Sequence, residues 1–158
     1  MIFRETGVEN TWIDCRPSTA EPPTPACKQP SSSTELFLKL LPPQMARAVP
    51  SDGDTFGLAL TEKDRPGKDA MIFYGRIADL ATTESLYTEY ILAAVMAHEI
   101  GHLLLGGGHS PTGIMRAKLN RWDLLQAGRG QLKFTPEQSL LIRDEVAARR
   151  ANRDGRGQ

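Results

Sequence analysis

The chain has 158 residues, of which 40% are hydrophobic and 24% are charged, and its 19 basic and 19 acidic residues give a formal net charge of zero. This composition is typical of a globular protein, and the length fits one domain. No basic excess favours a nucleic-acid partner. No apolar stretch approaches the roughly 18 residues that a membrane-spanning helix needs. We therefore expect one monomeric domain over residues 1–150 without a transmembrane segment, and a polar tail over 151–158.

The N-terminus does not resemble a signal peptide, because Met1 is soon followed by Arg4 and Glu5 instead of a basic start and a long apolar core. Residues 1–6 resemble the last turn of a helix that ends at Gly7. We therefore expect the chain to begin inside an element whose earlier part is missing.

Four segments have the alternation or the bounded apolar character of β-strands. They are residues 8–14, 35–41, 55–61 and 70–77. Pro42-Pro43 ends the second segment, because proline cannot donate a ladder hydrogen bond. The polar turn 64–68 separates the last two segments, which predicts that they pair.

Cys15 and Cys27 lie at the two ends of the most proline-rich part of the chain. This composition cannot pack a core, so we expect a surface loop. A disulfide that closes the loop would place the protein in an oxidising, extracytoplasmic compartment. Two free thiols are the alternative. Zinc binding by the two cysteines is a weaker alternative, because their spacing of twelve is not that of a ligand pair.

Residues 83–105 predict a long, partly buried helix. The stretch contains no Pro and one interior Gly, and its apolar residues recur every three or four positions. Three consecutive glycines at 106–108 then end the helix, because glycine has little helix propensity and readily adopts positive φ. The chain can turn back sharply at this point.

All three histidines fall between residues 98 and 109. His98 and His102 are four residues apart on the predicted helix, so their Cβ atoms lie about 5–6 Å apart and both imidazoles can reach one zinc ion. Glu99 is rotated by about 100° around the helix and can hydrogen-bond a water molecule instead. This is the H-E-x-x-H arrangement of zinc hydrolases. A chance match in a structural helix and a purely structural zinc site are the alternatives.

After the histidines, residues 118–126 predict a short helix that ends near Gly128. Thr135 is placed to cap a last helix, with Pro136 at its first position and Gln138 reaching back in a capping box. We therefore expect an α+β fold, in which a twisted mixed sheet is backed by the histidine-bearing helix and closed by a C-terminal helix.

At this point the sequence resembles the metzincin clan of zinc metalloproteases, from about residue 7 to 148. The clan's motif is H-E-x-x-H-x-x-G-x-x-H, followed by a tight turn that carries a Met. His98, Glu99 and His102 match the motif, and His109 corresponds to its third histidine. Gly113-Ile114-Met115 resembles the Met-turn. The resemblance implies a metzincin-like fold that lacks an N-terminal strand and helix.

The chain departs from the clan at two positions. Leu105 and Gly108 stand where the motif has its glycine and its third histidine, so one residue is inserted before His109. A glutamate on a later helix, as the gluzincins use, is the rival third ligand. Glu137 and Glu145 are the candidates, although neither lies in the gluzincin sequence setting.

The resemblance implies a zinc endopeptidase with one catalytic Zn²⁺. The metal would activate a water molecule, and Glu99 would act as its general base. The strand 55–61 would be an edge strand, on which Phe56, Gly57, Leu58 and Ala59 hold an extended peptide or protein substrate. A plain edge strand is the other interpretation.

One further departure concerns the position after the Met-turn. Many metzincins have a Tyr there, whereas Arg116 follows Met115 and no Tyr occurs after Tyr90. A metzincin-like zinc-binding module that binds peptides but cleaves little is therefore the alternative function.

Overall fold

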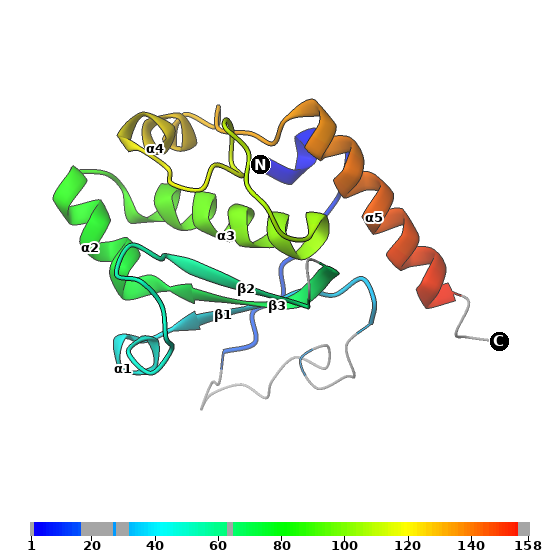
Figure 1. Cartoon of the computed structure of the whole chain (residues 1–158), viewed down its shortest axis with the longest axis horizontal. Helices are drawn as coiled ribbons and strands as arrows, with labels where there is room; N and C mark the ends of the chain where they lie inside the picture. The colour runs from blue at the N-terminus through cyan, green and yellow to red at the C-terminus, as the bar shows by residue number, and fades with distance from the viewer. Residues whose placement is uncertain (1, 17–26, 28–31, 63–64, 155–158) are drawn as a thin grey trace.

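A computed structural model describes residues 2–16, 27, 32–62 and 65–154 (Figure 1). The elements follow in the order η1 (Ile2–Thr6), β1 (Phe37–Leu41), α1 (Pro43–Ala46), β2 (Gly57–Glu62), β3 (Arg65–Phe73), α2 (Tyr74–Glu84), α3 (Thr88–Leu105), α4 (Arg121–Gly128) and α5 (Pro136–Asp154). Strands and helices are both present, so the α+β class is confirmed.

The three strands form a mixed sheet in the order β1-β3-β2. β1 runs parallel to β3, with Leu38 opposite Ala70, and β2 runs antiparallel to β3, with Gly57 opposite Ile72. β2 is therefore an edge strand, as predicted for residues 55–61. In Figure 1, α3 lies along one face of the sheet, and α4 and α5 lie on the other side of α3.

Helix α3 is buried on two sides. Toward the sheet, its residues Ile91 and Val95 pack in a cluster with Ile72. On the opposite side, its residues Ala97 and Leu104 belong to a second cluster. A helix that is apolar on most of its surface is stable only when it is enclosed in this way. This double burial fixes both the position and the rotation of α3.

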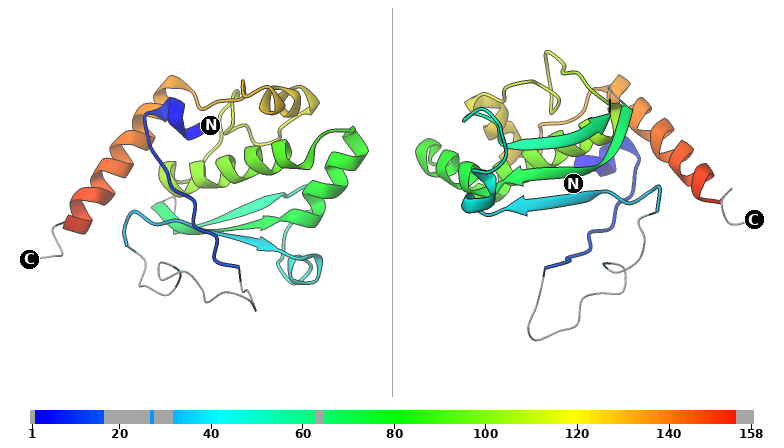
Figure 2. Two further views of the ribbon diagram at one scale, coloured as in Figure 1. Left: turned by 180° about the vertical axis from the view of Figure 1, so that it is seen from behind. Right: turned by 60° about the horizontal axis from the view of Figure 1, so that its bottom comes forward.

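The predicted strand 8–14 is wrong. These residues are described and form no strand, and the side chains of Trp12 and Ile13 are exposed by 54% and 48%. Alternation of apolar and polar residues predicts which way side chains point, but it does not supply a neighbouring strand. Figure 2 shows this segment running down the back of the molecule from η1.

The predicted boundaries between residues 70 and 88 are also wrong. β3 ends at Phe73, and Tyr74 begins a helix, α2, that the sequence pattern did not predict. Ser85 adopts a left-handed conformation, φ 53°, which ends α2 and separates it from α3. The apolar period continues across this break, so it could not show that the helix containing His98 begins at Thr88 instead of residue 83.

The other elements agree more closely with the sequence. η1 ends before Gly7, which has a φ of 77°, and α3 ends before Gly106, which has a φ of 80°. α4 begins later than the predicted 118, because Asn120 caps it through a capping box. The predicted capping box of Thr135 and Gln138 is present at the start of α5. α5 continues through Asp154, and residues 155–158 of the expected tail lie outside the described residues.

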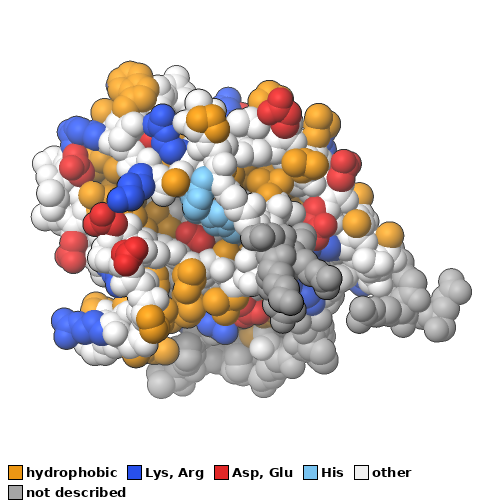
Figure 3. Space-filling model, viewed as in Figure 1, with side chains coloured by type: hydrophobic (Ala, Val, Ile, Leu, Met, Phe, Trp, Pro, Cys, Tyr) orange, Lys and Arg blue, Asp and Glu red, His pale blue; other side chains and the backbone are white. Residues whose placement is uncertain are grey.

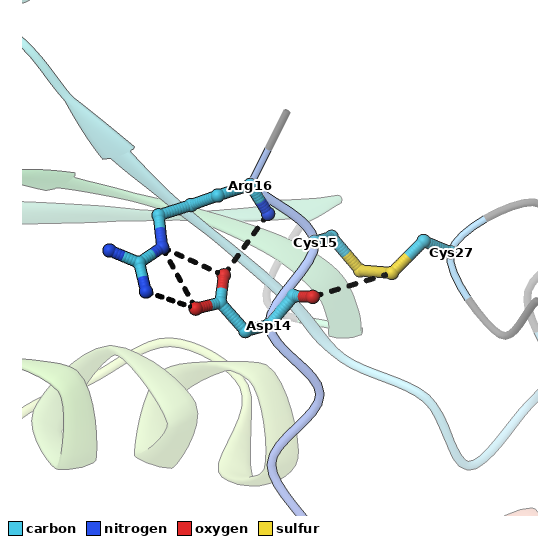
Figure 4. Close-up of a disulfide and its surroundings, with 4 residues drawn as sticks. All are labelled: Asp14, Cys15, Arg16 and Cys27. Atoms are coloured by element: carbon cyan, nitrogen blue, oxygen red, sulfur yellow. Dashed lines mark hydrogen bonds and ion pairs between the residues drawn. A yellow bond between two sulfur atoms is a disulfide. The ribbon is translucent and has the colours of Figure 1, made fainter. Parts of the chain in front are cut away.

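Cys15 and Cys27 form a disulfide, with their Cα atoms 5.7 Å apart, as predicted. Figure 4 shows it beside the ion pair between Asp14 and Arg16. Residues 17–26, which form most of the predicted proline-rich loop, lie outside the described residues. Closing a loop of this size stabilises a protein by about 3 kcal/mol in the chain-entropy model.

The search for membrane spans over the described residues found no helix with the length and apolar character that crossing a bilayer requires.

Gly101, near the C-terminal end of α3, permits close packing of the helix against Met115 and Phe134. A Cβ atom there would collide with Sδ of Met115 and lie 3.0 Å from the ring of Phe134. We expect Gly101→Ala to lower the free energy of unfolding by about 1–3 kcal/mol, because overpacking outweighs the gain in helix propensity. Urea titration measures the change. Met115→Ala should remove part of this penalty in the double mutant, and strictly additive effects would contradict the contact.

Candidate metal centre

His98 and His102 lie one turn apart on α3 and direct their imidazoles to the same point. Their Nε2 atoms are 3.0 Å apart and their ring centroids 4.7 Å apart. The Nδ1–H of His98 donates to the carbonyl of Ile114 at 2.7 Å, and Nδ1 of His102 faces the carbonyl of Gly106 at 3.3 Å. Hydrogen bonds of this kind select the tautomer whose Nε2 carries a lone pair, which is the form that binds metals.

His109 reaches the same point from the opposite direction. Gly106 and Gly108 have φ values of 80° and 104°, which favour glycine and turn the chain back after α3. The ring centroid of His109 lies 5.3 Å from that of His98 and 4.9 Å from that of His102. The glycine turn therefore brings His109 beside the other two histidines.

The three histidines fit a divalent transition metal. One ligand atom from each lies within 4.8 Å of the other two. Tetrahedral zinc with bonds of about 2.0–2.1 Å holds its nitrogen ligands about 3.3 Å apart, and the 3.0 Å between the first two Nε2 atoms is close to this value. Imidazole also suits copper, iron and nickel, so the donor set fits a class of metals and does not select one.

Burial keeps the first two histidines uncharged. Burial lowers the pKa of His98 to about 4, and it also lowers the pKa of His102. The hydrogen bond from His98 to Ile114 opposes the shift, and the neighbouring histidines add to it. Both imidazoles are therefore neutral near pH 7, so they need not lose a proton to bind a cation.

Glu99 lines the same cavity as the histidines and packs against the edge strand β2. Its side chain is only 6% exposed, and a Cβ atom at Gly57 would lie 2.5 Å from its Cγ and Oε1 atoms. Burial raises the pKa of Glu99 to about 7, while a hydrogen bond from the backbone N–H of Ala59 opposes the shift. A carboxyl group with this pKa can both accept and release a proton near neutral pH.

The histidines and Glu99 line a cavity of about 670 Å³. The predicted substrate-binding residues line the same cavity: Phe56, Gly57, Leu58 and Ala59. Residues 117–119, which follow the turn of residues 113–115, form another part of its wall. Figure 3 shows the histidine side chains reaching the surface near the centre of this face, so the candidate metal centre is open to solvent.

Met115 lies in a tight turn that packs against α3. It is 1% exposed, and its sulfur packs against Gly101, between the first two histidines in the sequence. Gly113 has a φ of 74°, and a Cβ atom there would lie 2.5 Å from the carbonyl of Lys133. The N–H of Ile114 donates to that same carbonyl at 3.0 Å. Ile114, whose carbonyl accepts the hydrogen bond from His98, is therefore anchored to Lys133 in the segment that precedes α5.

The rival glutamates are not part of the cluster. Among the described residues, the group of three or more side chains able to hold a metal consists of the three histidines. Glu145 instead accepts a hydrogen bond from Nε of Arg149 at 2.7 Å. Glu137 is likewise not a member of the cluster.

Sequence reasoning missed several supporting residues. Arg116 donates to Asp123 at 2.9 Å and to the carbonyl of Pro111 at 3.1 Å, which connects the turn that contains Met115 to α4. Gly57 was predicted to contact substrate, and its contact with Glu99 was not anticipated. The capping box of Asn120 and Asp123 was not predicted, although an Asp three residues after an Asn is a signal that could have identified it. Nothing in the sequence indicated that Asp123 would also pair with Arg116.

No known protein family, curated protein sequence or solved structure matches this chain.

The raised pKa of Glu99 predicts a pH-dependent stability. A carboxyl group with a pKa of about 7 when folded and about 4.5 when unfolded destabilises the fold as pH rises from 4.5 through 7. We compare the free energy of unfolding of Glu99→Gln with that of wild type, both free of metal. We expect this difference to be about 3 kcal/mol more favourable to the variant at pH 8 than at pH 4.5. Urea titration with a chelator present measures both values.

The comparison with wild type cancels the contribution of the buried histidines, which titrate in both proteins. A stability difference that stays constant from pH 4.5 to 8 would show that Glu99 ionises as it does in the unfolded chain.

Proposed function

We propose that the protein is a metzincin-like zinc endopeptidase. The observation that carries this proposal is the convergence of His98, His102 and His109 in an open cavity, with the buried carboxyl of Glu99 beside them. Three imidazole ligands leave one position of a tetrahedral ion for water or substrate, which is typical of catalytic and not of structural zinc sites. The Met-turn at Met115 adds to the resemblance.

Zinc in this centre would supply a Lewis acid, which lowers the pKa of water and polarises a peptide carbonyl. Glu99 accepts a proton from the attacking water and delivers it to the leaving amine. Burial raises the pKa of Glu99 to about 7 in the metal-free protein, and a cation beside it would lower that pKa and favour the carboxylate form that accepts a proton. Gly57 leaves room for the carboxyl group, and Ala59 orients it through its backbone N–H.

The edge strand supports a peptide or protein as the substrate. β2 pairs with β3 on one side only, so the backbone groups of its other side can bind an extended chain. Phe56 to Ala59 line the cavity together with the histidines, so a peptide added to this strand passes the metal centre. We propose a monomeric enzyme with no nucleic-acid partner.

The disulfide supports a location outside the reducing cytosol. Cys15 and Cys27 are paired, and such bonds persist mainly in secreted or extracytoplasmic proteins. We therefore propose that the protein is secreted or extracytoplasmic.

One observation favours a second function, a zinc-binding module that binds peptides but cleaves little. Arg116 occupies the position after Met115, and its guanidinium group is engaged by Asp123 and the carbonyl of Pro111. It therefore does not replace the Tyr that stabilises the oxyanion in many metzincins.

Cleavage of a denatured protein by zinc-loaded enzyme tests the proposal. We expect activity that a chelator abolishes and zinc restores. Glu99→Ala should keep its zinc and lose about 10²–10⁴-fold in rate, the usual scale for a general base. His109→Ala should lose zinc and activity together, because only two imidazoles then remain.

Metal content measured beside the rate separates the two functions. Wild-type protein that holds one zinc but cleaves no faster than Glu99→Ala is the binding module. Retention of zinc and full rate by His109→Ala would show that the third ligand lies elsewhere, and Glu137→Ala and Glu145→Ala then identify it.

Gly57 offers an independent test of the position of Glu99. We expect Gly57→Ala to lower the rate at least about tenfold without loss of zinc, because the added Cβ displaces the carboxyl group. Gly53→Ala is the matched control, since a Cβ atom there meets nothing within 4 Å. Equal rates for the two variants would contradict the contact between Gly57 and Glu99.

A further inference from the structure

Arg149 is a buried charge on α5 that the proposed mechanism does not use. It is 8% exposed. Its Nη2 donates to the carbonyl of Leu103 at 2.7 Å and to the carbonyl of Gly67 at 3.1 Å. Its Nε donates to Glu145, one turn earlier on α5, at 2.7 Å. One guanidinium group therefore joins α5, the last turn of α3 and the strand β3.

The carbonyl of Leu103 needs a donor because α3 ends two residues later. The N–H of Gly106 donates to the carbonyl of His102 at 3.0 Å, and this bond closes the helix. The carbonyls that follow lie beyond the last helical hydrogen bond and require other partners. A cation at this end of a helix also interacts favourably with its dipole. Arg149 supplies both the hydrogen bond and the charge.

This helix end is one of two anchors of the third histidine. Residues 107–109 connect Gly106 to Ser110, whose N–H donates to the carbonyl of Met115 at 2.8 Å. Glycines at 106–108 add little stiffness between the anchors. The position of His109 therefore depends on how firmly the last turn of α3 is held. Nδ1 of His102 faces the carbonyl of Gly106 in that same turn.

Packing alone does not account for a charge at position 149. A buried guanidinium group loses its hydration, and an apolar side chain of similar volume often fills such a position equally well. In addition, Nη1 of Arg149 is buried without a hydrogen-bond partner in the described structure. The benefit that offsets these costs lies in the carbonyl groups that Arg149 holds.

We propose that Arg149 is a positioning residue of the metal centre. It holds the last turn of α3, and through the glycine turn it presents His102 and His109 in the geometry that a metal requires. The inference rests on the proposed zinc site, and it assigns to α5 a role in metal affinity in addition to closing the fold.

Zinc affinity, measured by competition with a chromophoric chelator at constant pH, tests this role. We expect Arg149→Met to bind zinc about 10–100-fold more weakly, the usual loss when a group that orients metal ligands is removed. Arg149→Lys keeps one donor and should lose less. Arg143→Met is the matched control on the same helix, because Arg143 is exposed and packs near Gly7 instead of α3. A merely structural role would lower stability and leave the affinity of the folded protein unchanged.

Hydrogen exchange of the metal-free protein supplies a readout that does not depend on zinc. In Arg149→Met, the amides of residues 106–110 should exchange faster, while those of the central strand β3 near Ile72 keep the wild-type rate. If Arg149→Met does not fold, Glu145→Gln takes its place. We expect Glu145→Gln to weaken zinc binding and to speed exchange at residues 106–110, each by less than Arg149→Met would.

The outcomes separate the two proposals. Wild-type protein that binds no zinc overturns the proposed function, and exchange in the glycine turn then decides the role of Arg149. Wild-type zinc affinity and wild-type exchange in Arg149→Met, or changes equal to those of Arg143→Met, overturn the positioning role.

Discussion

The burial of α3 on two sides is the constraint on which the rest of the structure depends. The sheet covers one side and the cluster around Met115 covers the other, so the helix cannot rotate without exposing apolar surface. The remaining strip, which carries His98 and His102, faces the cavity. The third histidine then needs only a sharp turn at the end of the helix to join them.

The same burial sets the electrostatics of the candidate site. Removal of water keeps His98 neutral and makes the carboxyl group of Glu99 a weaker acid, because both charged forms lose hydration. Adjacent residues on one helix thus offer an uncharged ligand and a proton acceptor. A cation in this centre would meet two ligands, His98 and His102, that need not lose a proton first. The carboxyl group of Glu99 lines the same cavity and packs against β2.

Small residues act at the points of closest approach. Gly57 admits the carboxyl group of Glu99, and Gly101 admits the sulfur of Met115. Gly106 and Gly108 adopt positive φ, which redirects the chain toward the metal centre. These glycines have different physical roles, and a sequence pattern alone does not distinguish a glycine that turns the chain from one that makes room for a neighbour.

The sequence by itself determined the end of α3 and the placement of His98 and His102 on one helix, because both depend on local spacing and composition. It also predicted the α+β class, the disulfide and His109 as the third member of the cluster, but it left free thiols and a later glutamate as alternatives that only the fold decided. Only the tertiary structure decided that residues 8–14 form no strand, that Tyr74 begins a helix, and that Arg149 holds the end of α3. Strand pairing, the packing of a glycine and a buried guanidinium group each require a partner that is distant in the chain. The spacing of apolar residues predicts which side chains are buried, whereas only the tertiary structure shows which residues they pack against.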